Sequence, residues 1–185
     1  MSELLPDYTQ MLVLLGRALH VLRTEYDQQA VLVGGAAVEL HTGGRYATGD
    51  FDIHFPDAKL FSEVLDRYGF LKEKGVGRLL NRWYHPECLT YGVQIVSGYL
   101  YDGNSDRCRL QLIKIASDAE VIVPPVEDLI ADRLGQYCSI NNNSDKSSLE
   151  QAKLLVSLAE EIDWDYLRQR VVTEQGDLSL VEGIR

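Results

Sequence analysis

Apolar residues recur at two different spacings along the first part of the chain. Over residues 8–28 they follow the three-and-four spacing of an amphipathic helix, and Asp7 is its expected N-cap. The β-branched run AVLV at 30–33 stops at Gly34–Gly35, which predicts a short buried strand ended by a tight turn. The residues that follow, 36–41, predict a short helix.

Strands dominate the middle of the chain. The segment DFDIHF at 50–55 alternates polar and apolar residues and predicts a strand. Residues 57–69 predict an amphipathic helix with Asp57 at its start and Gly69 just beyond its end. Further strands are expected at 70–74, 78–84, 92–97, 108–115 and 119–123.

The last third of the chain has helical spacing, with a polar break at 141–145. The pattern therefore predicts an α/β (α+β) fold, with a helical C-terminal region after the strands. We divide the chain into an α/β core with an N-terminal helix, 1–123, and a helical region, 124–185. That region either packs on the core as one domain or forms a separate lobe. Its helices are expected at 126–140, 146–162 and 165–174.

Composition narrows the class of protein. The chain of 185 residues is long enough for one domain with its own core, and 45% hydrophobic content is ordinary for a globular protein. It contains neither a run of about 18 apolar residues nor a signal-peptide pattern, so we expect no membrane partner. Cys88, Cys108 and Cys138 form no CxxC pair, which argues against a disulfide framework or a zinc site and fits a reducing cytoplasm.

The net charge of −10 argues against extended nucleic-acid binding, which needs a basic surface. A local basic pocket is still compatible with this charge. The residues that could form such a pocket are Arg78, Arg82, Arg107, Arg109 and Lys114. The alternative is that they are scattered over the surface.

Two carboxylates lie on one face of the predicted strand at 50–55. Side chains alternate between the faces of a strand, so Asp50, Asp52 and His54 point one way and the three apolar residues point the other. Two carboxylates can hold a divalent metal, and Mg²⁺ also takes phosphate oxygens. The alternative is a half-exposed edge strand with polar residues toward water. His54 is either a ligand beside the aspartates or a polar neighbour on a solvated face.

The glycine turn upstream is a second candidate feature. A turn such as Gly34–Gly35 that leads into a helix lets backbone N–H groups approach an anion, and the helix N-terminus adds partial positive charge. A phosphate cradle followed by a metal holder is suited to phosphoryl or nucleotidyl transfer.

The segment GGAAVELHTGGRYATGDFDIHF resembles the signature of the nucleotidyltransferase superfamily with the polymerase-β-like fold. More narrowly, it resembles the abortive-infection type nucleotidyltransferase toxins and related bacterial proteins. The resemblance implies a mixed β-sheet flanked by helices, Mg²⁺ or Mn²⁺ as the metal and an NTP as substrate. It assigns metal binding and catalysis to Asp50 and Asp52, and nucleotide binding to Gly34, Gly35, Arg45 and Thr48.

The resemblance continues to about residue 160. The run VPPVEDLIADRLGQY at 123–137 is similar to the helix start that follows the core in this group, and it places Arg133 where a lysine is common. Arginine keeps the positive charge needed to bind phosphate. The run SDKSSLEQAKLL at 144–155 resembles a degenerate KDxxDL pattern and places Asp145 at its first acid, as a further nucleotide-binding candidate.

One position departs from the family pattern. Active members carry a third carboxylate on a later strand, and the resemblance places Gln94 at that catalytic position. An amide brings neither a negative charge nor a general base. Either a loop acid supplies the missing charge or the chemistry has decayed. The loop candidates are Asp102, Asp106 and Glu87.

Several other residues have ordinary structural interpretations. Asp128 and Asp132 lie one turn apart and are expected on a solvated helix face, and Glu39 is expected at the surface. Four tyrosines either form a stacking wall for a base or are plain sheet residues: Tyr84, Tyr91, Tyr99 and Tyr101.

Three functional hypotheses follow. The first is Mg²⁺-dependent transfer of a nucleotidyl group from an NTP to RNA, a protein hydroxyl or a small molecule. The second is a catalytically decayed member of the same fold that binds a nucleotide or a protein partner, for example an antitoxin in a toxin–antitoxin system. The third is a structural α/β domain in which the acidic strand is an exposed edge.

Overall fold

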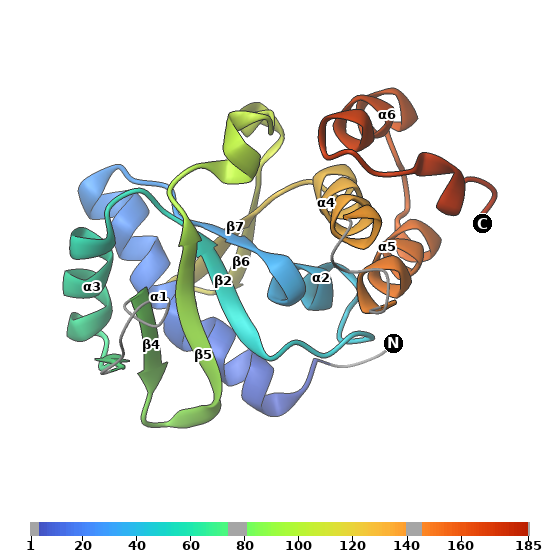
Figure 1. The fold of residues 1–185 in the computed structure, drawn as a ribbon. Helices are drawn as coiled ribbons and strands as arrows, with labels where there is room; N and C mark the ends of the chain where they lie inside the picture. Colours follow the sequence, from blue (N-terminus) through green and yellow to red (C-terminus); the bar gives the residue numbers. More distant parts are fainter. Residues whose placement is uncertain (1–3, 74–80, 140–145, 185) are drawn as a thin grey trace.

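The fold is a single mixed sheet with helices on one face and beyond one end (Figure 1), in a computed structural model that describes residues 4–73, 81–139 and 146–184. The helices are α1 (Pro6–Tyr26), α2 (Gly34–His41), α3 (Ala58–Arg67), α4 (Val126–Cys138), α5 (Ser147–Leu158) and α6 (Trp164–Thr173). The strands are β1 (Val31–Val33), β2 (Asp50–His54), β3 (Leu71–Lys72), β4 (Arg82–His85), β5 (Cys88–Ser97), β6 (Gln111–Ala116) and β7 (Ala119–Val123). Short 3₁₀ turns are η2 (Leu100–Gly103), η3 (Arg107–Arg109) and η4 (Leu178–Leu180).

The sheet order is β3-β4-β5-β2-β1-β7-β6. The pairs β1–β7 and β2–β5 are parallel, and the remaining neighbours are antiparallel. The predicted mixed sheet flanked by helices is therefore confirmed. Strand β2 lies between β1 and β5, so the alternative that the acidic strand is an exposed edge is wrong.

One part of the hydrophobic core lies between the sheet and helices α1 and α3, and the rest extends to the C-terminal helices. Phe51 of β2 stacks on Tyr8 of α1 with ring centroids 5.1 Å apart, and Tyr91 of β5 meets the Phe51 ring edge-on at 5.6 Å. Burial of Phe51 and Ile53 on this side leaves Asp50, Asp52 and His54 facing the other side of the sheet. Burial of the apolar face thus determines which way the carboxylates point.

Several predicted element boundaries differ from the structure. Leu5, not Asp7, is the N-cap of α1, because Pro6 already occupies the first helical turn, where its missing N–H costs nothing. Helix α2 begins at Gly34 itself, directly after β1. The predicted strand at 70–74 is only Leu71–Lys72, and β5 begins earlier than predicted, at Cys88. The N-cap role of Asp57 is confirmed by its bonds to the backbone N–H groups of Lys59 and Leu60.

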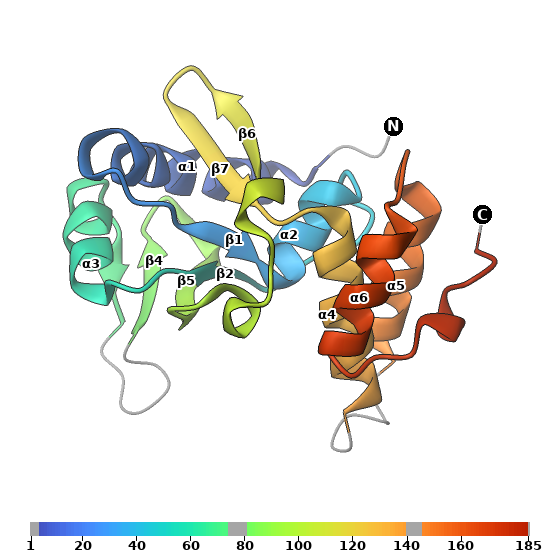
Figure 2. The same ribbon diagram turned by 90° about the horizontal axis from the view of Figure 1, so that it is seen from above.

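Helices α4, α5 and α6 lie side by side beyond one end of the sheet, next to α2 (Figures 1 and 2). The division into a 1–123 core and a 124–185 helical region stays a prediction. The predicted polar break at 141–145 lies outside the described residues. Within the described ranges, no helix combines the length and apolar character needed to cross a bilayer.

Candidate functional site

Strand β2 places its two carboxylates against different partners on the neighbouring strands. In the sheet register, Asp52 is opposite Val33 of β1 and Gln94 of β5, and Asp50 is opposite Gly92. The position that the resemblance assigned to the third acid therefore lies directly beside Asp52. We refer to Asp50, Asp52, Arg82 and Gln94 as the sheet cluster.

Asp50 is paired with Arg82, which was predicted from the sequence only as a candidate for a local basic pocket. Arg82 of β4 donates from Nη2 to Asp50 Oδ1 at 2.7 Å, and the Gly92 backbone N–H donates to the same oxygen at 3.1 Å. Arg82 Nε also lies 3.7 Å from a carboxylate oxygen of Glu73. Both members of the Arg82–Asp50 pair are about 30% exposed, so the pair remains in contact with water.

Asp52 is held by an amide. Gln94 donates from Nε2 to Asp52 Oδ1 at 2.7 Å. Burial raises the pKa of Asp52 above its usual value, and the negative charges of Asp50 and Asp132 raise it further. The Gln94 hydrogen bond and the positive charge of Arg133 act in the opposite direction. Asp52 is thus a carboxylate whose charge the apo protein compensates only in part.

The glycine turn approaches Asp52 closely. Gly34 has a φ of +64°, and a Cβ at this position would lie 2.3 Å from Asp52 Oδ2. A Cβ on Gly35 would lie 2.6 Å from Thr48 Oγ1. Both glycines are therefore required by close contacts, and at Gly34 the backbone conformation adds a second reason.

Thr48 joins the glycine turn to the acidic strand. Its hydroxyl donates to the carbonyl of Asp50 at 3.1 Å, and its backbone N–H donates to Glu39 Oε2 at 2.7 Å. Glu39 is fully buried, so the expectation of a surface position was wrong, and burial raises its pKa. Helix α2 thus uses a buried carboxyl group to position the segment that enters β2.

A cavity of about 280 Å³ lies between the sheet cluster and the helical region. Arg133 of α4 lines it and bonds Asp132 with Nε at 2.9 Å, while its Nη1 donates to Gln151 at 3.3 Å. The positive charge of Arg133 is therefore partly neutralised by the carboxylate of Asp132. The lining residues are Val33, Gly34, Asp52, His54, Val96, Tyr101, Asp102, Asp132, Arg133, Gln136 and Glu174.

The structure brings together only part of the predicted set. Gly34, Asp52 and Arg133 line the cavity. Gly35, Thr48, Asp50 and Gln94 do not line it, but Gln94 bonds Asp52, and Thr48 bonds the Asp50 carbonyl and lies against Gly35. Arg45 is exposed and does not line the cavity. Asp145 lies outside the described residues. The functional roles of all these residues stay predictions.

Of the three loop acids, Asp102 alone lines the cavity. Asp106 instead caps the turn η3 and lies near Arg109. Glu87 bonds through its backbone to His85 and Gln10. Asp102 and its neighbour Tyr101 have φ values of 54° and 45°, which non-glycine residues rarely adopt.

His54 lies at the edge of the cavity. Its Nδ1 is 3.3 Å from the carbonyl oxygen of Ser97, and its ring meets Tyr101 edge-on at 5.8 Å. Burial lowers the pKa of His54 below its usual value. A neutral His54 imidazole provides no positive charge to compensate the carboxylate of Asp52.

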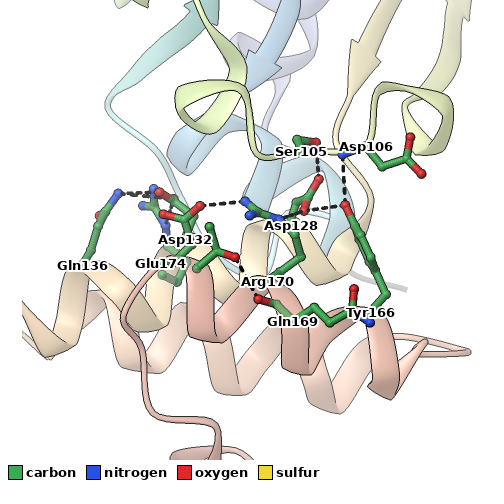
Figure 3. A network of polar contacts seen from close by, with 11 residues as sticks. Ser105, Asp106, Asp128, Asp132, Gln136, Tyr166, Gln169, Arg170 and Glu174 are labelled. Atoms are coloured by element: carbon green, nitrogen blue, oxygen red, sulfur yellow. Dashed lines mark hydrogen bonds and ion pairs between the residues drawn. The ribbon is translucent and has the colours of Figure 1, made fainter.

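Behind the cavity, helices α4 and α6 share a buried polar network that sequence reasoning missed (Figure 3). Asp128 is 0% exposed, so its expected solvated position was wrong. Arg170 Nε donates to Asp128 Oδ1 at 2.6 Å and its Nη2 donates to Glu174 Oε1 at 2.6 Å. Tyr166 and Ser105 also donate hydroxyl bonds to Asp128. We refer to Ser105, Asp128, Tyr166, Arg170 and Glu174 as the helix cluster.

Two carboxylate oxygens of the sheet cluster are open to a metal ion. Among the described residues, no group of three or more His, Cys, Asp or Glu side chains is arranged to hold a metal ion. Asp50 and Asp52 each bond through Oδ1, and their Oδ2 atoms have no hydrogen-bond partner in the described part of the chain. Mg²⁺ is commonly held by one or two carboxylates together with substrate phosphates and waters, so these residues fit a single ion that arrives with a nucleotide.

Comparisons with known proteins agree with the fold. A family model described as nucleotidyltransferase of unknown function (DUF6036) matches residues 10–182. A comparison with curated proteins gave no match.

Solved structures share the architecture at low sequence identity. An antigenic nucleotidyltransferase-like protein from Paracoccidioides brasiliensis has a TM-score of 0.61 and 16% identity, over 98% of this chain and 95% of that one. JHP933 from Helicobacter pylori has a TM-score of 0.59 and 16% identity, over 91% of this chain and 74% of that one. The antibiotic-resistance factor ANT(2'')-Ia has a TM-score of 0.57 and 12% identity, over 90% and 92%. Identities this low show similarity of fold alone.

Proposed function

Since the chain belongs to the nucleotidyltransferase family of unknown function DUF6036, we propose that it transfers a nucleotidyl group from a Mg²⁺-bound NTP to an acceptor hydroxyl. The acceptor oxygen would form a bond to the α-phosphorus, and the bond from that phosphorus to the β-phosphate oxygen would break. Pyrophosphate would leave with the electron pair. The hydroxyl proton would pass to water, because the Gln94 amide is not a base.

The observation that carries this proposal is the close approach of Gly34 to Asp52. A carboxylate oxygen of Asp52 lies where a Cβ of residue 34 would be, at the first turn of a helix, so only glycine leaves room for it. A triphosphate could therefore meet backbone N–H groups and the metal-binding face within one site. Bound there, Mg²⁺ would neutralise phosphate charge and orient the leaving group.

The chain's own residues divide the remaining work. Asp50 and Asp52 would hold the ion through their Oδ2 atoms, while Arg82 and Gln94 keep both side chains oriented. Arg133 would contact phosphate from α4, and the adjacent Asp132 fixes the position of its guanidinium group.

A second candidate function is nucleotide or protein binding without catalysis, for example with an antitoxin. The observation that favours it is the Gln94–Asp52 hydrogen bond, which occupies a metal-binding oxygen with an amide where a third acid would add charge. Asp50 is similarly neutralised by Arg82. Both contacts would weaken a metal site.

Pyrophosphate release distinguishes the two functions. Each of ATP, GTP, CTP and UTP would be incubated with the protein and Mg²⁺, alone and with a short RNA or a serine-containing peptide. Transfer predicts release that the Asp50→Asn/Asp52→Asn double variant loses. Retained nucleotide binding without release would support the second function. The absence of both would overturn nucleotidyl transfer and the nucleotide-binding form of the second function.

A further inference from the structure

A second cavity, of about 390 Å³, borders the candidate site. It is formed by Gln28 and Gln29 before β1, Pro56 after β2 and Tyr99 after β5. His54 lines both cavities. Because His54 is two residues from Asp52 on the same strand face, a ligand beside His54 lies roughly 7 Å along the strand from the carboxylate.

The short segment 99–102 separates the two cavities. Tyr99 lines the second cavity, and Tyr101 and Asp102 line the first. Leu100 between them is 4% exposed and belongs to a small apolar cluster with residues of β1 and β7. This segment is therefore anchored on the sheet, in the region where the loop after β5 passes beside β1 (Figure 2).

The two cavities differ in charge. The first has one guanidinium group, on Arg133, against the carboxylates of Asp52, Asp102, Asp132 and Glu174. The second contains one group of each sign, Asp27 and Arg107. A phosphate without a bound metal is repelled by the first cavity, and the second has no such excess of negative charge.

Arg107 is the basic group available to a ligand in the second cavity. Its Nη2 lies 3.4 Å from Gln29 Oε1, and within the described residues it makes no ion pair. Arg107 and Gln29 also line an adjoining hollow of about 240 Å³. This hollow is also lined by Leu112 of β6 and Ile122 of β7, so Arg107 lies between two neighbouring cavities.

Tyr99 provides the second cavity with a flat aromatic surface. The residue is 75% exposed, which is high for a side chain of its size, and the amide groups of Gln28 and Gln29 lie at the same cavity. An exposed ring stacks on any nucleobase, amides bond to base edges, and arginine binds phosphate. Together these groups match a base joined to a phosphate.

We propose that this second cavity is the acceptor site, and that the acceptor is the end of a ribonucleotide chain. Its terminal base stacks on Tyr99, a backbone phosphate binds Arg107, and its hydroxyl reaches past His54 toward Asp52. The assignment rests on the proposed nucleotidyl transfer, whose substrate class it names. It also reconciles RNA binding with the net charge of −10, because only a short local groove is used.

Fluorescence of a short ribonucleotide that carries 2-aminopurine at its end tests the binding site without catalysis, because stacking quenches this base. Tyr99→Ala should abolish the quenching and raise the Kd of the probe about fivefold or more. Tyr99→Phe keeps the aromatic ring and should retain both the quenching and the affinity of the wild type. Arg107→Ala should weaken binding severalfold and flatten its salt dependence. The matched control is Arg168→Ala, which removes an exposed arginine of α6 and should change neither the affinity nor the salt dependence.

The Asp50→Asn/Asp52→Asn variant should bind the probe as tightly as the wild type, since the acceptor site is separate from the metal-binding face. This keeps failure of the acceptor assignment distinguishable from failure of the proposed transfer. Unchanged quenching in Tyr99→Ala, or no binding to the wild type, would overturn the assignment even if pyrophosphate is released. Transfer of labelled nucleotide to a serine-containing peptide but not to the ribonucleotide would also overturn it.

Discussion

The sheet cluster and the helix cluster both pair aspartate with arginine, yet their environments differ. In the helix cluster Asp128 and Arg170 are 0% and 3% exposed at the side chain, and Asp128 accepts bonds from Ser105, Tyr166 and Arg170. In the sheet cluster Asp50 and Arg82 are about 30% exposed, and each aspartate has an oxygen that is not bonded within the described chain. The first arrangement is suited to stability and the second to binding.

The physical basis of this difference is how the charges are compensated. A buried ion pair is tolerated when hydrogen bonds satisfy most of each group, and its loss leaves an uncompensated charge in the interior. Asp128 is fully bonded, whereas Arg170 Nη1 is buried without a hydrogen-bond partner among the described residues. A partly exposed carboxylate with a free oxygen can accept a cation from solution. The following predictions test this contrast, from the largest expected effect to the smallest.

Breaking the helix cluster should cause the largest loss of stability. Arg170→Ala leaves Asp128 buried without its cation, so the free energy of unfolding should fall by about 3–5 kcal/mol in urea denaturation. Arg168→Ala removes an arginine from an exposed pair with Asp165 and should cost less than about 1 kcal/mol. Equal losses in the two variants would mean that the buried pair has no special role.

Gly34→Ala should damage the sheet cluster. The added Cβ would clash with Asp52 Oδ2, and the positive φ adds about 1–2 kcal/mol of backbone cost. We expect loss of Mg²⁺–ATP binding in calorimetry together with reduced stability. Gly183→Ala shares the positive φ but has open space around it, so it should lose stability and keep binding. Normal binding by Gly34→Ala would contradict the proposed site.

Gln94→Glu should separate stability from metal binding. Without metal, the new carboxylate faces Asp52 at the distance of the present hydrogen bond, so stability should fall by about 1 kcal/mol. With Mg²⁺ the added charge should tighten ion binding severalfold in a calorimetric titration. An unchanged Mg²⁺ affinity would show that this position is not part of the metal-binding face.

The smallest effect is a pH-dependent gain in stability from Asp52→Asn. Because the pKa of Asp52 is raised on folding, its contribution to stability is fully present below the usual aspartate pKa and is lost as the pH rises through the raised value. In metal-free buffer, Asp52→Asn should therefore be more stable than the wild type near neutral pH, and the difference should shrink as the pH falls toward 4. Asp50→Asn removes the partner of Arg82 and should show no such gain. Greater wild-type stability at neutral pH would contradict the direction given for Asp52.

Local periodicity was enough to predict much of the fold and the orientation of the acidic strand. The alternation around Phe51 and Ile53 requires Asp50 and Asp52 to share a face, whatever the rest of the chain does. The Gly-Gly pair that begins α2 was equally visible in the sequence, although the contacts with Asp52 and Thr48 that require it come from the fold. The resemblance added Gln94, which the parallel pairing of β2 and β5 places beside Asp52.

Contacts between distant segments were decided only by the tertiary structure. The strand order brings Arg82 to Asp50, and the packing of α6 on α4 buries Asp128 and brings Glu174 to the cavity. The spacing of Asp128 and Asp132 places them on one side of a helix, but it carries no information about which neighbour covers that side. Sequence pattern determines where a side chain points relative to its own backbone, whereas its partners depend on strand order and helix packing.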